Sequence, residues 1–218
     1  WMQYLQGLGR TLQITVMALI IGVILGVAVA VLRTAHDQQR VGQRSMVLGI
    51  INTVCKLYTT IIRGTPMMVQ LLIMSLVIFS HSRDFAMVGA LTLGINSGAY
   101  VAEIVRSGLM SVDAGQMEAG RSLGLNYSIT MRFVVVPQAI KNILPALGNE
   151  FITLLKDTSL ITVIGGKEML YAAQAIYAKT YAPMMPLVGT AILYLIVVVL
   201  FTWLLGILER RLRQSDRR

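Results

Sequence analysis

The sequence is poor in charge. Only 13% of its 218 residues are Asp, Glu, Lys or Arg, whereas 56% are hydrophobic and the mean hydropathy is +0.70. A soluble globular domain carries about 25% charged residues. The shortage of charge therefore indicates that most of the surface of this chain faces lipid.

Cysteine and histidine are scarce as well. The single cysteine, Cys55, excludes an intrachain disulfide and fits no metal-ligand spacing. The two histidines lie far apart, so neither a zinc site nor a catalytic triad is evident. We expect His36 to be solvated in a polar connector and His81 to lie near the outer membrane interface. The sequence thus offers no catalytic residues and no metal ligands.

A nucleotide-binding loop is also missing. Residues Gly165-Gly166-Lys167-Glu168 resemble only the end of G-x-x-x-x-G-K-[ST], because the upstream glycine and the hydroxyl residue are absent. We therefore expect that this chain does not bind ATP through that motif. We also find no nucleophile–base pair that would support an intramembrane enzyme.

Long apolar runs are what the sequence does contain. A membrane-spanning helix needs about 20 predominantly apolar residues, so the chain can cross a bilayer about five times. We place the spans at about 11–32, 49–79, 85–110, 138–164 and 184–208. The sequence predicts an all-α membrane protein in which residues 1–218 form a single transmembrane domain.

Two other segments lie between the predicted spans. A polar stretch at about 111–136 interrupts the chain, and Gly165-Gly166 end the fourth span. An amphipathic stretch at about 167–180, with Tyr171 and Tyr177, is typical of an outer interfacial helix. The G-x-x-x-G pairs Gly22/Gly26 and Gly94/Gly98 predict close helix packing.

Charge asymmetry predicts the orientation. Lys and Arg are concentrated in cytoplasmic segments of membrane proteins. Segments 33–48, 106–141 and 209–218 hold twelve of them, whereas the opposite side holds Arg10, Arg83, Lys167 and Lys179. The twelve are Arg33, Arg40, Arg44, Arg106, Arg121, Arg132, Lys141, Arg210, Arg211, Arg213, Arg217 and Arg218. We expect the N-terminus outside and the C-terminus inside.

The same distribution bears on nucleic acid and on the start of the chain. The sequence pI is near 10.1, but the basic residues gather at span ends rather than in one patch, which argues against nucleic-acid binding. The chain begins at Trp1, so we expect a few native residues to precede it, and the first apolar stretch is long enough to span rather than to be a cleaved signal peptide.

The polar stretch predicts a short helix for docking. Asp113 is a suitable N-cap, with Gln116 placed to complete a capping box, and Gly124 is placed to end the helix in a left-handed conformation. A helix of two to three turns is marginal alone, so contact with a partner would stabilise it. For Glu118 we prefer docking to a merely solvated helix charge.

Several motifs resemble those of binding-protein-dependent importer permeases of the polar amino acid type. The matching pieces are Asn96-Ser97-Gly98-Ala99-Tyr100-Val101-Ala102-Glu103, Glu118-Ala119-Gly120-Arg121-Ser122-Leu123-Gly124, Pro137-Gln138-Ala139, Leu155-Lys156-Asp157-Thr158-Ser159-Leu160 and Arg63-Gly64-Thr65-Pro66. Where the family loop usually has Glu-Ala-Ala, this chain has Gly120, which we expect to soften the short helix slightly.

This resemblance implies a type I ABC importer permease of a bacterial inner membrane. It implies that a second permease chain, two ATPase subunits that bind ATP and Mg²⁺, and an extracytoplasmic substrate-binding protein are the partners, and that an amino acid is the substrate. The coupling residues it implies are Glu118, Ala119, Gly120, Arg121, Leu123 and Gly124. The alternative is a secondary carrier or channel driven by an ion gradient, but no inverted repeat supports it.

Charged side chains within the spans are expensive, and they indicate a substrate path. Glu150 and Asp157 are seven residues apart and would project from one helix face. Asn96 and Tyr100 are four apart on the third span. Carboxylates suit the ammonium group of an amino acid, although salt bridges with Lys156, Lys56 or Arg63 are an alternative.

Three further residues have weaker signals. Pro66 would kink the second span and free the carbonyl of Ile62, so Thr65 and Met67 are weaker candidates for substrate contact. Glu103 lies three residues before Arg106, which predicts a structural pair on one helix.

Overall fold

The structure is a computed structural model that describes residues 2–37, 39 and 45–214. Trp1 and four of the basic residues used to assign orientation, Arg40, Arg44, Arg217 and Arg218, lie outside the described residues. The helices, in chain order, are α1 (Met2–Asp37), α2 (Met46–Gly64), α3 (Met67–Ile73), α4 (Phe85–Met110), α5 (Ala114–Ser122), α6 (Tyr127–Thr130), α7 (Val136–Asp157), α8 (Met169–Thr180) and α9 (Met184–Gln214).

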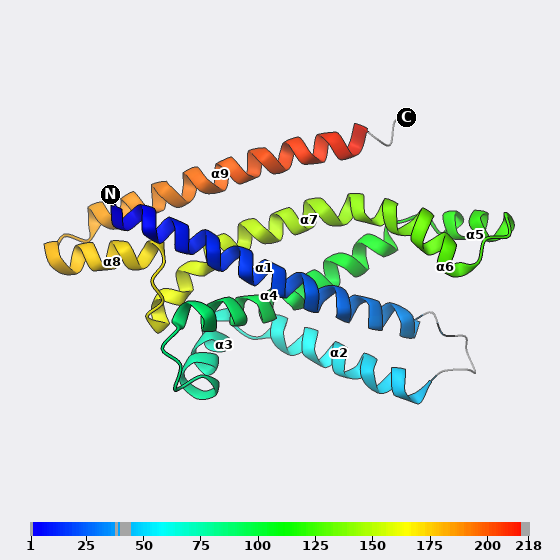
Figure 1. Cartoon of the computed structure of the whole chain (residues 1–218), viewed down its shortest axis with the longest axis horizontal. Coiled ribbons are helices and arrows are strands. Elements are labelled where there is room, and N and C mark those ends of the chain that lie inside the picture. Colours follow the sequence, from blue (N-terminus) through cyan, green and yellow to red (C-terminus); the bar gives the residue numbers. More distant parts are fainter. Residues whose placement is uncertain (1, 38, 40–44, 215–218) are drawn as a thin grey trace.

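The long helices run roughly along one axis of the molecule (Figure 1). The start of α1 and the whole of α8 lie at one end, and α5 with α6 lies at the opposite end. Within the described ranges, α1, α2, α4 and α9 are long and apolar enough to cross a membrane, judged by length and composition. α7 has 22 residues and is the more polar fifth long helix. The described part of the chain contains no strand, in agreement with the predicted all-α class.

Helix α1 begins earlier than predicted. The expected span began at residue 11, but α1 begins at Met2 and continues to Asp37. Its first turns are held by tertiary contacts rather than by apolar character alone: the Tyr4 hydroxyl donates to the carbonyl of Pro186, and Gly7 is buried against the start of α8.

The second predicted span is broken rather than kinked. α2 ends at Gly64, and Thr65 and Pro66 are extended, with φ and ψ of −116° and 145° for Thr65. A residue before proline disfavours the helical region, which explains the break. The chain then turns into α3 and a π-helical turn, Met74–Ile78 (Figure 1).

The fourth span starts earlier than predicted and changes helix type, but it ends at Ile164 as predicted. Helical structure begins at Tyr127, because Asn126 caps it by accepting from the amide of Ile129 at 2.9 Å. A π-helical turn, Met131–Val135, then leads into α7 and accommodates Pro137, which lacks an amide hydrogen. The α-helix ends at Asp157, and a 3-10 helix (η3, Thr158–Ile164) completes the segment. Gly165, with φ of 88°, stops it as expected.

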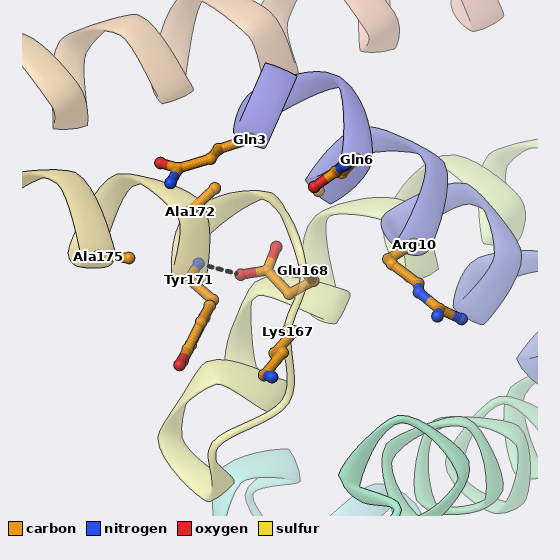
Figure 2. A pocket seen from close by; sticks show the side chains of 9 residues that line it. Gln3, Gln6, Arg10, Lys167, Glu168, Tyr171, Ala172 and Ala175 are labelled. Carbon is orange, nitrogen blue, oxygen red and sulfur yellow. Dashed lines mark hydrogen bonds between the residues drawn. The ribbon is translucent and has the colours of Figure 1, made fainter. Parts of the chain in front are cut away.

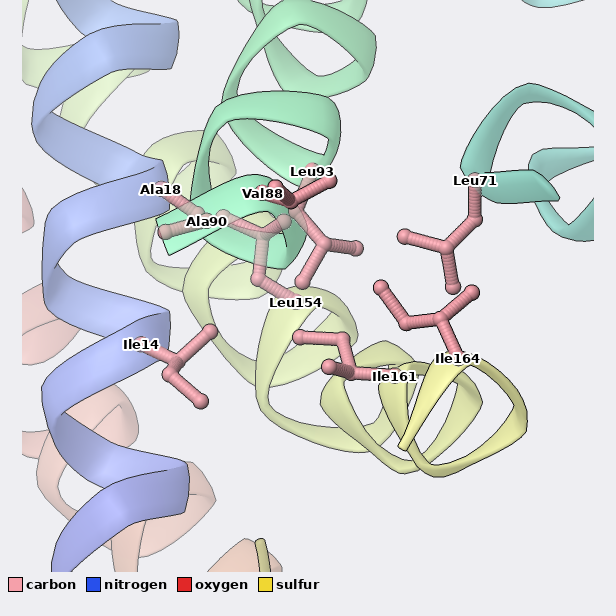
Figure 3. Packing of buried hydrophobic residues seen from close by; sticks show 9 residues of the cluster. All are labelled: Ile14, Ala18, Leu71, Val88, Ala90, Leu93, Leu154, Ile161 and Ile164. Carbon is pink, nitrogen blue, oxygen red and sulfur yellow. The ribbon is translucent and has the colours of Figure 1, made fainter. Parts of the chain in front are cut away.

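The core lies where α1, α3, α4, the end of α7 and η3 meet. Buried residues from all five segments form one cluster (Figure 3). Its members are Ile14, Ala18, Leu71, Val88, Ala90, Leu93, Leu154, Ile161 and Ile164. This packing fixes α3 and η3 against the two central helices.

The predicted glycine packing between α1 and α4 is confirmed. A methyl group at Gly26 would lie 2.6 Å from the Val101 side chain, and one at Gly94 would lie 2.7 Å from Ile21. Such distances are well below van der Waals contact, so only glycine allows these backbones to approach so closely. The resulting α1–α4 pair forms the scaffold for the polar groups described next.

Candidate functional site

Two acidic side chains lie on one face of α7. Glu150 and Asp157 both belong to the regular α-helical part, so their spacing of seven residues places them on the same face. Both are partly buried. The pair is separated by about 10 Å along the helix axis, at about 1.5 Å per residue.

Glu150 is held by the neighbouring helix α4. The Ser97 hydroxyl donates to Glu150 Oε1 at 2.7 Å, and Ser97 itself is fully buried. Among the described residues, neither Lys56 nor Arg63 forms an ion pair with Glu150. The structure therefore does not support a salt bridge for Glu150, whose Oε1 accepts from the neutral Ser97 hydroxyl instead.

Asp157 differs from Glu150 in its surroundings. Its carboxylate accepts no side-chain hydrogen bond and forms no ion pair among the residues that the structure describes. It also occupies the last α-helical position before η3. Asp157 therefore has acceptor capacity that the described chain does not use.

Asn96 and Thr65 are joined through Gln70. Asn96 Nδ2 donates to Gln70 Oε1 at 3.0 Å, and Gln70 Nε2 donates to Thr65 Oγ1 at 2.8 Å. Gln70 Nε2 also lies 2.7 Å from the carbonyl of Ile62, which Pro66 deprives of its helical donor. The freed carbonyl was predicted from the sequence, but its partner was not.

This arrangement makes Thr65 a structural residue. Its hydroxyl also donates to the carbonyl of Ile61 at 2.9 Å. The adjoining pocket, of about 260 Å³, is lined mainly by apolar side chains such as Ile61, Val69 and Ile73. An apolar wall of this kind does not suit the charged ends of an amino acid.

Tyr100 and Met67 contact residues other than the two carboxylates of α7. The Arg63 guanidinium carbon lies 5.3 Å from the Tyr100 ring centroid, which is a cation–π contact. Met67 packs against the main hydrophobic cluster. Neither residue forms a described hydrogen bond with Glu150 or Asp157.

The predicted Glu103–Arg106 pair is wrong. Glu103 Oε1 instead pairs with Arg33 Nη1 of α1 at 2.5 Å, and Arg106 pairs with Asp37 at 3.2 Å. Interhelical partners are available because α1 and α4 lie side by side. His36 is likewise not simply solvated, since its Nδ1 lies 3.1 Å from Asn52 Nδ2 of α2.

The short helix α5 has the ends that the sequence predicts. Asp113 Oδ1 accepts from the amide of Gly115 at 2.6 Å. At the other end, the amides of Leu125 and Gly124 bond the carbonyls of Gly120 and Arg121, and Gly124 has φ of 80°. These two bonds are those of a Schellman motif. The capping box is not formed, because Gln116 Oε1 accepts from Gln138 Nε2 of α7 at 3.2 Å.

Five of the six predicted coupling residues are exposed on this loop. Glu118, Ala119, Arg121, Leu123 and Gly124 face outward, and Leu123 is 80% exposed. Gly120 is buried instead, and a methyl group there would overlap the fully buried Thr130 side chain. Gly120 therefore lets α5 pack on α6, which corrects the expectation that it merely softens the helix.

Sequence reasoning missed Gln70 and Ser97. Gln70 is a lone amide side chain within an apolar run, four residues after Pro66. Its closeness in sequence to the carbonyl that Pro66 frees could have indicated a hydrogen bond between them. Ser97 belongs to one of the family-like motifs, but nothing in the sequence indicated its bond to Glu150, because a serine in a membrane helix commonly bonds its own backbone. Only the closeness of α4 and α7 reveals its role.

Comparisons with known proteins agree in fold and family. Residues 22–214 match the family described as binding-protein-dependent transport system inner membrane component. The chain is 36% identical to the arginine transport system permease protein ArtQ of Bacillus subtilis, over 97% of this chain and 93% of that protein. It is 34% identical to the glutamine transport system permease protein GlnP of Escherichia coli K12, over 96% and 92%.

Solved structures give the same result. A crystal structure of an amino acid ABC transporter with histidines superposes with a TM-score of 0.86 at 41% identity, covering 96% of this chain and 94% of that one. The MetNI methionine ABC transporter shares the fold, with a TM-score of 0.75 at 19% identity over 95% of each chain. The chain therefore belongs to the family of binding-protein-dependent transport system inner membrane components and has the type I ABC importer permease fold.

Proposed function

We propose that this chain is the transmembrane permease subunit of an ATP-driven importer of polar, chiefly basic, amino acids. The observation that carries the proposal is the pair of carboxylates on one face of α7, within a bundle whose relatives include an arginine permease. Their separation of about 10 Å suits the two cationic groups of an extended basic amino acid. An ion-gradient-driven carrier is not favoured, because the family is one of binding-protein-dependent systems.

Each carboxylate has a separate role in this proposal. Asp157, which accepts no hydrogen bond from described side chains, binds the ammonium group common to all amino acids. Glu150, held by Ser97 at 2.7 Å, reads the cationic side chain. Asn96 and Tyr100 flank the path on α4, whereas Thr65 and Met67 support its wall.

The exposed face of α5 is proposed to dock onto an ATPase subunit. Glu118, Arg121 and Leu123 supply a carboxylate, a guanidinium and an apolar side chain on one short, doubly capped helix. Two such chains, identical or homologous, would form the pathway, and two ATPase subunits would bind ATP and Mg²⁺. The α5 end of the bundle would face the cytoplasm, and the α8 end would receive a substrate-binding protein.

Uptake of labelled arginine and glutamine by vesicles containing the assembled transporter tests the substrate site. We expect Asp157→Asn to impair both substrates and Glu150→Gln to impair arginine more than glutamine. A hydrogen bond to a charged group is worth about 1.5–3 kcal/mol, or about ten- to a hundredfold in apparent affinity. Unchanged arginine uptake by Glu150→Gln, at equal membrane abundance, would assign Glu150 a structural role alone.

A further inference from the structure

A further acidic side chain, that of Glu168, is buried outside the proposed substrate site. Its side chain is only 1% exposed, and it lies where α8 begins. Glu168 Oε1 accepts from the Thr162 hydroxyl at 2.5 Å and from the Tyr171 amide at 2.8 Å. Glu168 Oε2 accepts from the Tyr194 hydroxyl at 2.7 Å. A buried carboxyl group is thus surrounded by neutral donors from η3, α8 and α9.

No cation compensates this carboxyl group within the described chain. The ion pairs that the structure describes involve other residues. Arg10 and Lys167 lie in the same pocket but extend away from Glu168 (Figure 2). Neutral hydrogen bonds alone therefore hold the group, so each of them matters for its placement.

Helix α1 closes the cluster from the other side. The Thr11 hydroxyl lies 3.5 Å from Glu168 Oε2 and accepts from the Met169 amide at 3.3 Å. Gly7, one turn earlier, leaves no room for a side chain, because a methyl group there would lie 2.8 Å from Met169 Cα. Four segments, α1, η3, α8 and α9, thus converge on one carboxyl group.

The cluster connects the molecular end that carries α8 with Asp157. Asp157 is followed directly by η3, and η3 is tied to Glu168 through Thr162. Above Glu168, a pocket of about 240 Å³ opens between α1 and α8. A partner that binds at this pocket and displaces α8 would disturb the hydrogen bonds of Glu168.

We propose that Glu168 is a positioning residue that locks η3, and with it Asp157, to α8, so that displacement of α8 at the outer surface is passed to the substrate carboxylate. This inference rests on the proposed function for the role of Asp157. The physical linkage between α8 and η3 does not depend on it. The outer group that displaces α8 is the substrate-loaded binding protein.

Spin-label distances test the linkage directly. In a Cys55→Ala background, labels at the exposed positions Val163 on η3 and Ala178 on α8 report how these segments lie relative to each other. In the assembled transporter we expect one narrow distance distribution. Glu168→Leu should shift or broaden it, and Glu168→Gln, which keeps an acceptor oxygen, should restore most of it.

Tyrosine variants provide a matched pair. Tyr194→Phe removes a hydroxyl that bonds Glu168, whereas Tyr177→Phe removes one on α8 that does not. We expect Tyr194→Phe to change the distance distribution in the same direction as Glu168→Leu, and Tyr177→Phe to leave it unchanged. Should Glu168→Leu fail to assemble, the tyrosine pair decides the question.

Transport provides the second readout. With the loaded binding protein varied, the half-saturating concentration should rise about tenfold in Glu168→Leu, which is the effect of losing about one hydrogen bond. ATP hydrolysis without binding protein should stay unchanged, which a general loss of folding would not allow. Unaltered distances and half-saturation in both Glu168→Leu and Tyr194→Phe would overturn the inference. Normal uptake by Asp157→Asn would instead overturn the substrate site, while the distances would still report on Glu168.

Discussion

Arg33 Nη1 of α1 lies 2.5 Å from Glu103 Oε1 of α4, and this ion pair fastens the two central helices near the end of the bundle that carries α5. Arg33 is buried, whereas Glu103 is about one-third exposed. The pair therefore leaves a buried cation without compensation if Glu103 is removed, which is the costly case for such pairs.

We accordingly expect Glu103→Gln to lower the melting temperature of the purified chain more than Asp37→Asn does. Asp37 pairs with Arg106 at 3.2 Å and is more exposed, so its loss should matter little. Thermal unfolding in detergent measures both. The swap Arg33→Glu with Glu103→Arg should recover part of the stability lost in either single variant. Equal, small effects of Glu103→Gln and Asp37→Asn would contradict this assignment.

Substitution of Gln70 should loosen the α2–α3 break more than substitution of Thr65. Gln70→Leu leaves the partly buried Ile62 carbonyl and Asn96 amide without their partner, and an unsatisfied buried polar group costs about 1–3 kcal/mol. Thr65→Val removes one hydroxyl but leaves Gln70 bonded to Ile62. Limited proteolysis at the α2–α3 break measures local opening. Cleavage of Gln70→Leu no faster than that of Thr65→Val would show that Gln70 does not hold the break.

The α5 helix should couple transport to ATP hydrolysis. Glu118→Ala and Gly124→Trp should leave the chain inserted but reduce substrate-stimulated ATP hydrolysis in reconstituted vesicles. Gly124 faces open space, so Gly124→Trp adds bulk to the docking face, although its φ of 80° also strains any side chain. Gly124→Asn, which tolerates this conformation with less bulk, is the control and should retain more stimulation. Full stimulation and transport in both test variants would mean that α5 is not the coupling element.

The two ends of the bundle should be labelled from opposite sides of the membrane. Ser122 lies at the end of α5, and Ala178 is exposed on α8, whereas Ala173 is fully buried and unsuitable as a reporter. In a Cys55→Ala background, Ser122→Cys should react only with reagents that reach the cytoplasm, and Ala178→Cys with impermeant reagents from outside. Labelling of both from the same side would overturn the assigned orientation.

The sequence was most informative where a single physical rule acts locally. Apolar length located the long helices, and Asp113 and Gly124 located the ends of α5. Predictions from the sequence failed where a contact with a neighbouring helix determines the local structure. The partner of Glu103 lies on α1, and the Thr130 side chain leaves room only for glycine at position 120. The break at Pro66 is accommodated because Gln70 donates to the carbonyl that Pro66 frees.

The change of helix type after Asp157 has a geometric consequence. A 3-10 helix rises about 2.0 Å and turns about 120° per residue, against about 1.5 Å and 100° in an α-helix. Over the seven residues of η3 the segment is therefore about 3.5 Å longer than an α-helix of equal length. Moving this boundary by one residue would translate the Asp157 end by about 0.5 Å and rotate it by about 20°. The distance between Asp157 and Glu168, which lie on opposite sides of η3, can thus be adjusted finely without any hinge in α7.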